Sequence, residues 1–335
     1  CTMYRTRIFC AAAAALLFLT AVPAAGGEII RDFNESFEVK PGAALRVRHG
    51  DGDVTITPWD KDVIEITVHY YAERKGFGDD SDHDFKVKFD EKNGVIEVTG
   101  KESRSGFMGL QVYILKEYTY EISAPRYVEL DLQGDDGNIE IEKWTGQIEI
   151  KLDDGDIDLY GCEPGKTKIR AMDGELILDG HSGSLDIIVD DAKIDINRSK
   201  LKECRIQAED GGIRVRDSGG DFYIEVDDGD TELLRIKTNV MDLKAQDGDI
   251  DIELLKTGKL DLEIRTDDGD VDLSLQGGIS AFFSIDVDDG RIRTDLPSAE
   301  DVQSGNSWMS GKLGKGNGKI RIRTNDGSVM LREIR

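Results

Sequence analysis

The chain has 335 residues and is strongly acidic, with 68 Asp and Glu residues against 43 Lys and Arg and a formal net charge of −25. This charge argues against nucleic acid as a partner and against binding to anionic lipid, because both require a basic surface. Apolar residues make up only 39% of the chain, but Ile, Val and Leu recur at even spacing throughout, which argues against disorder.

An export signal is predicted at residues 1–25. Two arginines precede a nearly continuous apolar run over Ile8–Val22, and the small residues Ala24 and Ala25 follow it. This is the layout of a secretory signal peptide cut near those alanines. An uncleaved membrane anchor is the alternative, but a run of about 15 residues is shorter than the roughly 20 that a span requires. We therefore expect export to the periplasm, the cell surface or the extracellular space, with no membrane span in the mature chain.

Residues 28–129 predict a β-rich entry region. Apolar and polar residues alternate over Leu45–Ile56, Val63–Tyr71 and Val112–Ile122, which is the pattern of half-buried strands. Gly76–Asp84 is predicted to be a polar loop. No segment of the mature chain shows a strong helical period.

Residues 130–335 are built on a repeated Asp-Gly pair. From Gly137 to Gly248 the steps between glycines alternate between 18 and 19 residues, and Asp191-Ala192 replaces the pair once. Such a period is typical of a repeat architecture. The glycines of these pairs, including one early copy in the entry region, are Gly52, Gly137, Gly155, Gly174, Gly211, Gly229, Gly248, Gly269, Gly290 and Gly327.

Each repeat unit predicts two short strands joined by a corner. Counted from the glycine, positions −7, −5, −3, +2 and +4 are apolar, and the alternation changes parity at Asp-Gly, so the chain turns there. Around Gly155 these residues are Ile148, Ile150, Leu152, Ile157 and Leu159. The constant register favours an all-β parallel solenoid of 18–19-residue units, with a two-sheet β-sandwich of repeated strands as the alternative. Position −3 alternates between large and small residues, which leaves open whether one coil holds one unit or two.

Five segments of the chain resemble a known family. They are Phe37–Gly42, Gly52–Trp59, Tyr120–Pro125, Leu130–Gly134 and Gly311–Lys319. With the Asp-Gly units, they are similar to the bacterial putative-adhesin β-strand-repeat family over nearly the whole mature chain. The resemblance implies an exported, envelope-associated β-repeat protein whose biochemical role is largely undefined, and it brings no catalytic residues with it.

The aspartate before each corner glycine has two possible roles. Stacked coils bring these carboxylates to about 4.8 Å from one another, so an interaction must offset their repulsion. Turn chemistry is favoured, in which the Asp side chain accepts a backbone N–H two residues on. Calcium between coils is the alternative, but Lys193 and Arg291 follow two of the corners and cannot be ligands. Sporadic calcium binding stays open at two clusters, Asp227, Asp228 and Asp230, and Asp267, Asp268 and Asp270.

The remaining chemistry-bearing residues predict no catalytic, cofactor or metal site. Gly311–Lys319 lacks the phosphate-loop pattern and is interpreted as a flexible hairpin. The histidines lack ligand spacing and are interpreted as surface or strand residues: His49, His69, His83 and His181. The tryptophans are assigned to packing or capping of the coil ends, rather than to sugar stacking: Trp59, Trp144 and Trp308.

The two cysteines left after signal removal are not expected to form a disulfide. Cys204 occupies an inward −7 position and is predicted to be a buried thiol, whereas Cys162 lies in a loop two units earlier. Two coils separate them by about 10 Å, beyond the roughly 7 Å that a disulfide spans.

These observations predict a non-enzymatic exported envelope protein that acts as a scaffold or an adhesin-like binding surface. Its partner would be an envelope protein or a glycan, and no cofactor is expected. An enzyme acting on polysaccharide is one alternative, although short coils leave little room for the loops that build a cleft. A calcium-dependent binding module is the other.

Overall fold

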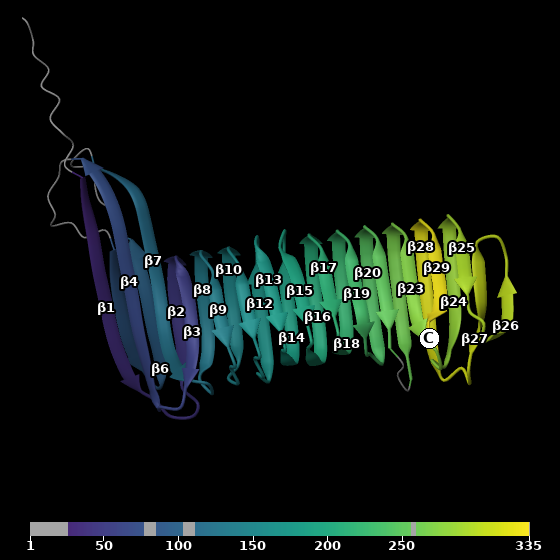
Figure 1. Ribbon diagram of the computed structural model, residues 1–335, viewed down its shortest axis with the longest axis horizontal. Helices are drawn as coiled ribbons and strands as arrows, with labels where there is room; N and C mark the ends of the chain where they lie inside the picture. Colours follow the sequence, from purple (N-terminus) through teal and green to yellow (C-terminus); the bar gives the residue numbers. More distant parts are fainter. Residues whose placement is uncertain (1–25, 77–84, 103–110, 256–258, 335) are drawn as a thin grey trace, which may run out of the picture.

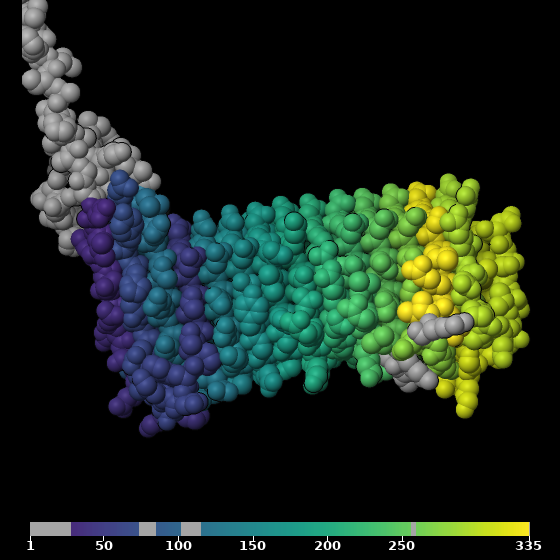
Figure 2. Space-filling view, in the orientation of Figure 1, coloured from purple at the N-terminus to yellow at the C-terminus, as the bar shows by residue number. Residues whose placement is uncertain are grey.

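The protein is a two-sheet parallel β-solenoid. The computed structural model describes residues 26–76, 85–102, 111–255 and 259–334, and these contain 29 strands and no helix. The coils lie in a row along the long axis of the molecule (Figure 1), and the space-filling view shows the same elongated shape (Figure 2). The predicted solenoid is therefore confirmed, and the β-sandwich alternative is wrong because neighbouring repeat strands pair in parallel.

Two sheets contain all the described strands. Sheet A has 14 strands in the order β1(Gly26–Glu38), β4(Val63–Gly76), β7(Gln111–Pro125), β3(Asp53–Trp59), β9(Ile139–Glu142), β11(Ile157–Tyr160), β13(Glu175–Asp179), β15(Lys193–Asn197), β17(Ile213–Arg216), β19(Thr231–Ile236), β21(Ile250–Leu254), β23(Val271–Gln276), β29(Val329–Ile334) and β25(Ile292–Asp295). Sheet B has 15 strands in the order β26(Ala299–Ser304), β27(Trp308–Leu313), β24(Ala281–Asp289), β28(Gly318–Asp326), β22(Asp261–Asp268), β20(Val240–Asp247), β18(Gly219–Asp228), β16(Lys200–Asp210), β14(Ser182–Val189), β12(Lys166–Ala171), β10(Ile148–Asp154), β8(Glu129–Asp136), β2(Ala44–Asp51), β6(Val95–Glu102) and β5(Phe85–Lys92).

One repeat unit makes one coil. A strand of sheet B leads through the Asp-Gly corner into a strand of sheet A, and the next unit pairs directly beside it, as Ile150 does with Ile169 and Leu159 with Leu178. The 37-residue alternation is therefore a packing pattern between neighbouring coils. Its −3 residues are all buried in the core: Leu152, Ala171, Val189, Ala208, Val226 and Ala245. In the outermost coil, β24–β25, the positions two and four residues after the corner glycine are not fully buried: Ile292 is half-buried and Thr294 is exposed.

The corner glycines stack directly on one another. Gly155 has a φ of +127°, and a Cβ atom there would lie 2.4 Å from the carbonyl oxygen of Gly137. Gly174 stands in the same relation to Gly155, with 2.1 Å. Each corner therefore excludes a side chain for two reasons, the backbone conformation and the preceding coil.

Ala192 shows how one coil does without the glycine. It does not share the positive φ of the glycines. The N–H of Asp191 donates to Met172 O over 2.7 Å, the N–H of Lys193 donates to Gly174 O over 3.0 Å, and the Ala192 side chain is buried. The backbone of this corner is hydrogen-bonded to the preceding coil, and the Ala192 methyl group lies in the core. The repeat therefore tolerates alanine at a corner whose φ is not positive.

Both ends of the stack depart from sequence order. The first coil, β2–β3, lies between β6–β7 and β8–β9, because β2 pairs with both β6 and β8 and β3 with both β7 and β9. The last coil, β28–β29, lies between β22–β23 and β24–β25. In Figure 1 the yellow C-terminal strands accordingly sit inside the stack, with β24 to β27 beyond them.

This threading overturns the interpretation of Gly311–Lys319 as a hairpin. The segment joins β27 to β28, but these strands do not pair with each other. Both pair with β24, which lies between them, β27 antiparallel and β28 parallel. Gly314 and Gly316 adopt positive φ values of 55° and 68°, which allow the chain to turn past the end of β24 and enter β28.

Extra strands and an aromatic cluster cover the N-terminal end of the core. β1, β4 and β7 form an antiparallel extension of sheet A, and β5 and β6 an antiparallel pair at the end of sheet B. Phe85 packs between the two sheets with ring centroids 5.9 Å from Phe33, 5.2 Å from Tyr70 and 4.6 Å from Tyr118. The predicted strands of the entry region are confirmed as β2 to β4 and β7, and the predicted loop at 76–84 lies almost wholly outside the described residues.

Gly155→Ala should destabilise the solenoid, because the new methyl group meets the Gly137 carbonyl and the backbone is strained. We expect a loss of about 3 kcal/mol in the free energy of unfolding, measured by denaturant titration with circular dichroism. Gly165→Ala is the matched control, since a Cβ there meets nothing within 4 Å. Equal stability of the two variants would contradict the stacked corner.

Candidate functional site

The acidic corners are the first candidate, and a hydrogen-bonded ladder occupies them. At six corners, the side chain of the residue after the glycine accepts the backbone N–H of the equivalent residue in the next coil. Asp53 Oδ1 accepts from Asn138, Asn138 Oδ1 from Asp156, and Asp156 Oδ1 from Glu175, each over 2.9 Å. These oxygens therefore stabilise the stacking of coils.

A second run of the same ladder lies further along the stack. Asp230 Oδ1 accepts from Asp249 over 3.0 Å, Asp249 Oδ1 from Asp270 over 2.9 Å, and Asp270 Oδ1 from Ser328 over 2.7 Å. Lys193 and Gly212 lie between the two runs and provide no carboxylate. From the sequence, this position is recognisable only as a possible calcium ligand, because the hydrogen-bond partner is apparent only once the coils are stacked.

The described residues contain no group of three or more His, Cys, Asp or Glu side chains arranged to hold a metal ion. Each of the two predicted calcium clusters has one member in the ladder, Asp230 or Asp270.

Substitutions at Asp249 distinguish a hydrogen-bonded ladder from a calcium site. Asp249→Ala removes the acceptor for the Asp270 N–H and should cost about 1 kcal/mol of unfolding free energy. Asp249→Asn keeps an acceptor, as Asn138 does naturally, and should leave stability equal or slightly higher because like charges are relieved.

Thermal unfolding is measured for both variants and the wild type with calcium and with chelator. We expect the same midpoint under the two conditions. A midpoint that rises with calcium in the wild type and not in Asp249→Asn would show that the corners bind the metal.

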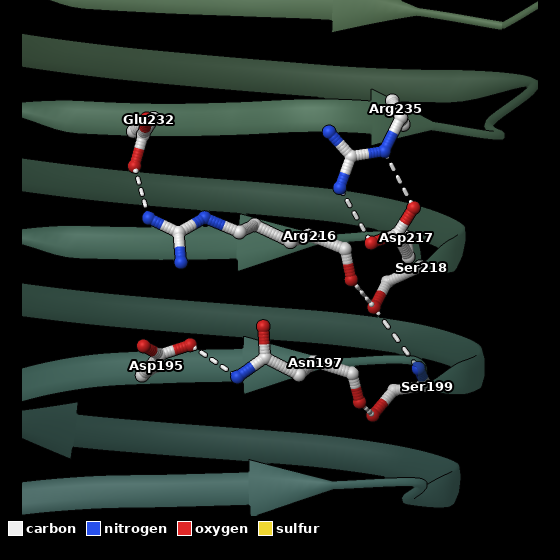
Figure 3. Close-up of polar contacts among 8 residues, drawn as sticks. All are labelled: Asp195, Asn197, Ser199, Arg216, Asp217, Ser218, Glu232 and Arg235. Carbon is white, nitrogen blue, oxygen red and sulfur yellow. Dashed lines mark hydrogen bonds and ion pairs between the residues drawn. The ribbon is translucent and has the colours of Figure 1, made fainter.

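The opposite corner of the coils holds a second polar ladder (Figure 3). Ser199 Oγ accepts from the His181 N–H over 3.1 Å and donates to Asn197 O over 2.8 Å. Ser218 Oγ accepts from the Ser199 N–H over 3.0 Å and donates to Arg216 O over 2.7 Å. Both serines are buried, so these hydroxyls satisfy backbone groups inside the corner.

The arginines beside this ladder are held by carboxylates. Arg235 bonds Asp217 through two parallel contacts of 2.6 Å, and Arg216 bonds Glu232 over 3.0 Å (Figure 3). Arg235 lowers the pKa of Asp217 through this hydrogen bond. The charges cancel within the cluster, so this corner is a structural network rather than an anion site.

The histidines divide into buried and exposed positions. His49 on β2 and His181 before β14 are 2% and 1% exposed, so the interpretation of His181 as a surface or strand residue is wrong. His69 on β4 is exposed and pairs with Asp32 over 2.8 Å. His83 lies outside the described residues. His49 fills space that Gly134 leaves, since a Cβ on that glycine would lie 2.0 Å from the ring.

The cysteines are both buried as free thiols. The inward position predicted for Cys204 is confirmed, and burial raises its pKa to about 12. The Cys162 thiol donates to Ile141 O over 3.5 Å, and burial raises its pKa to about 11. Neither thiol has the depressed pKa of a nucleophile.

Trp144 is fully buried and donates its indole N–H to Val128 O over 2.8 Å, which confirms its predicted packing role. Trp59 donates to Val63 O over 2.7 Å and carries the Lys61 ammonium 4.0 Å above its ring. Trp308 lies on β27, next to β24 near the far end of sheet B, and is 41% exposed.

The buried histidines should make the protein less stable in mild acid. Burial lowers the pKa of His49 and of His181 from 6.5 to about 4, so the unfolded chain binds protons that the folded chain does not. Their stabilisation is complete above pH 6.5 and is lost as the pH falls through 4, with about 2 kcal/mol per histidine already lost at pH 5.

Denaturant titrations at pH 7.5 and 5 check this expectation. In His49→Leu, the fall in unfolding free energy between pH 7.5 and pH 5 should be smaller by the contribution of one buried histidine, which is about half of the total from His49 and His181. His69→Gln should not reduce it, because Asp32 raises the pKa of His69 and the sign is opposite. A wild-type protein equally stable at both pH values would contradict the prediction.

A groove crosses several strands on the outer face of sheet B. Two adjoining cavities of about 280 and 560 Å³ share Tyr223 and Asp242. The smaller cavity continues to Asp186 on β14, and the larger one to Phe282 on β24. We call this combined feature the sheet B groove. Its residues come from strands separated in sequence by about a hundred positions, so sequence reasoning could not assemble it.

A family model matches almost the entire described chain. The model of Toastrack DUF4097, a domain of unknown function, matches residues 43–221 and again 220–332. The chain belongs to the Toastrack DUF4097 family. This match confirms the resemblance to the putative-adhesin β-strand-repeat family.

Solved structures similar to this Toastrack protein have low sequence identity to it. A "putative cell adhesion protein" from Clostridium sporogenes is 13% identical, with 91% of this chain and 100% of that one covered and a TM-score of 0.22. A "putative adhesin" from Bacteroides fragilis is 11% identical, covering 94% and 100%, with 0.35. A "putative lipid binding protein" from Parabacteroides distasonis is 12% identical, covering 94% and 99%, with 0.38. No curated protein matches the chain.

Among the described residues of this Toastrack protein, no helix is long and apolar enough to cross a membrane.

Proposed function

We propose that this Toastrack protein is a non-enzymatic, exported cell-envelope scaffold that presents an adhesin-like binding surface. The observation that carries the proposal is the sheet B groove, which extends across several coils of a continuous hydrogen-bonded stack. Repeat proteins bind partners over extended surfaces of this kind, because each coil adds one row of side chains to the same face.

The sequence of residues 1–25 supports export. An apolar run over Ile8–Val22, preceded by two arginines and followed by the small residues Ala24 and Ala25, has the layout of a secretory signal peptide. Cleavage near those alanines leaves every described strand intact.

The packing of the coils supports a binding role over catalysis. Several side chains of the kind that a hydrolase uses have structural roles here: the carboxylates of Asp53 and Asp156 accept backbone N–H groups of the next coil, and both thiols are buried with raised pKa values. Most residues that line the groove lie on strands of sheet B, and Lys259, Gly316 and Asn317 lie on the connections between strands.

Expression of the full chain with a C-terminal tag in bacteria tests export and binding together. We expect the tagged protein outside the cytoplasm, with an intact mass that lacks the first 24 or 25 residues, and we expect it to capture an envelope component. A panel of neutral and acidic glycans, incubated with the purified protein, should show no cleavage. Cytoplasmic retention with the signal uncut would overturn the proposal of export, and glycan turnover would overturn the non-enzymatic role.

A further inference from the structure

The sheet B groove has an aromatic side chain at each end of its larger cavity. Tyr223 on β18 is half-buried and carries the Arg205 guanidinium 4.6 Å above its ring, and Phe282 on β24 is 55% exposed. The strands β20, β22 and β28 lie between them, so the two aromatics stand about 19 Å apart along the axis of the molecule. We call the rings of Tyr223 and Phe282 the aromatic platforms.

The C-terminal coil completes the groove. Because β28 is inserted between β22 and β24, Lys319 lies in register between Asp261 and Phe282, and Arg321 lies beside Glu263. A stack in sequence order would have placed Phe282 directly beside β22. The threading of the chain therefore sets the length of the groove and brings cations into it.

Several of the charges between the aromatic platforms are paired. Lys259 contacts Asp261 over 2.7 Å, and Glu263 contacts both Arg265 over 2.5 Å and Arg321 over 3.7 Å. The floor thus offers donors and acceptors with little net charge, while the whole chain carries −25 and repels anionic polymers.

One carboxylate oxygen in the groove is buried without a hydrogen bond from the protein. Asp242, which lines both cavities, has Oδ1 in this state. Asp242 as a whole is half-buried, so its carboxylate offers the groove an acceptor for a ligand that supplies a hydroxyl donor.

We propose that the sheet B groove binds an uncharged glycan chain lying along the axis of the solenoid, an inference that rests on the proposed binding function. Sugar rings stack their C–H faces on Tyr223 and Phe282, and hydroxyl groups donate to Asp242 and accept from Lys319. A protein partner fits less well, because the cavities are shallow and their walls alternate in charge rather than offering one deep apolar pocket.

The test uses the purified chain from residue 26 to 335 and isothermal titration with soluble cellulose, xylan and starch fragments, with polygalacturonate as the acidic comparison. We expect at least one neutral glycan to bind and the acidic polymer to bind more weakly. Tyr223→Ala and Phe282→Ala should each reduce affinity about tenfold, and Asp242→Ala should also reduce it.

Tyr160→Ala provides the matched control, because Tyr160 lies on β11 of sheet A, outside the groove. Circular dichroism confirms that each variant is folded. A glycan fragment that is too short to reach both Tyr223 and Phe282 should bind more weakly to only one of the two variants, Tyr223→Ala or Phe282→Ala.

Two results would overturn the glycan proposal. One is that no neutral glycan binds while the tagged protein still captures an envelope protein, which leaves the proposed function standing with a protein partner. The other is glycan binding that the groove variants do not weaken. Failure to capture any envelope component, glycan or protein, would instead overturn the proposed function itself.

Discussion

The whole molecule depends on the close stacking of one backbone corner on the next. A Cβ atom on Gly155 or Gly174 would lie within 2.4 Å of the carbonyl of the preceding corner, so neighbouring coils approach each other without side chains between them. This contact sets the constant register of the strands on both sides. The register in turn lines up the apolar columns of the core and the polar columns of the surface.

Acidity follows from the same constraint. Strands buried on one face alternate between apolar and polar residues, and the polar face here is rich in carboxylates. At the corners, Asp53, Asp156 and Asp249 are acceptors for the backbone of the next coil, so part of the charge stabilises the stack. A net charge of −25 therefore describes a solvated repeat surface and does not identify a partner. The partner is better sought where the charges are balanced, in the sheet B groove.

The first and the last coil in sequence are both held inside the stack by threading. Strands β6 and β7 cover the coil β2–β3, and strands β24 and β25 cover the coil β28–β29, whereas the first described strand, β1, is the outermost strand of sheet A. The terminal segments of a repeat protein otherwise fray, because an end coil has a neighbour on one side only. The same threading assembles the groove, since it places Lys319 and Arg321 between β22 and Phe282.

Local structure can be read from the sequence, because the strands, the corner and the inward face of each repeat unit are encoded within 18–19 residues. The burial of Cys204 follows in the same way, since it occupies an inward position of its unit, whereas Trp144 could be assigned only to packing or capping. The order of the coils and the pairing of ladder residues such as Asp270 and Ser328, 58 positions apart, become apparent only in the folded protein. All units have the same register and the same apolar pattern, so the sequence of one coil does not specify which other coil stacks on it. Which coil stacks on which is decided by the connections and the packing of the whole chain, and the groove exists only in that order.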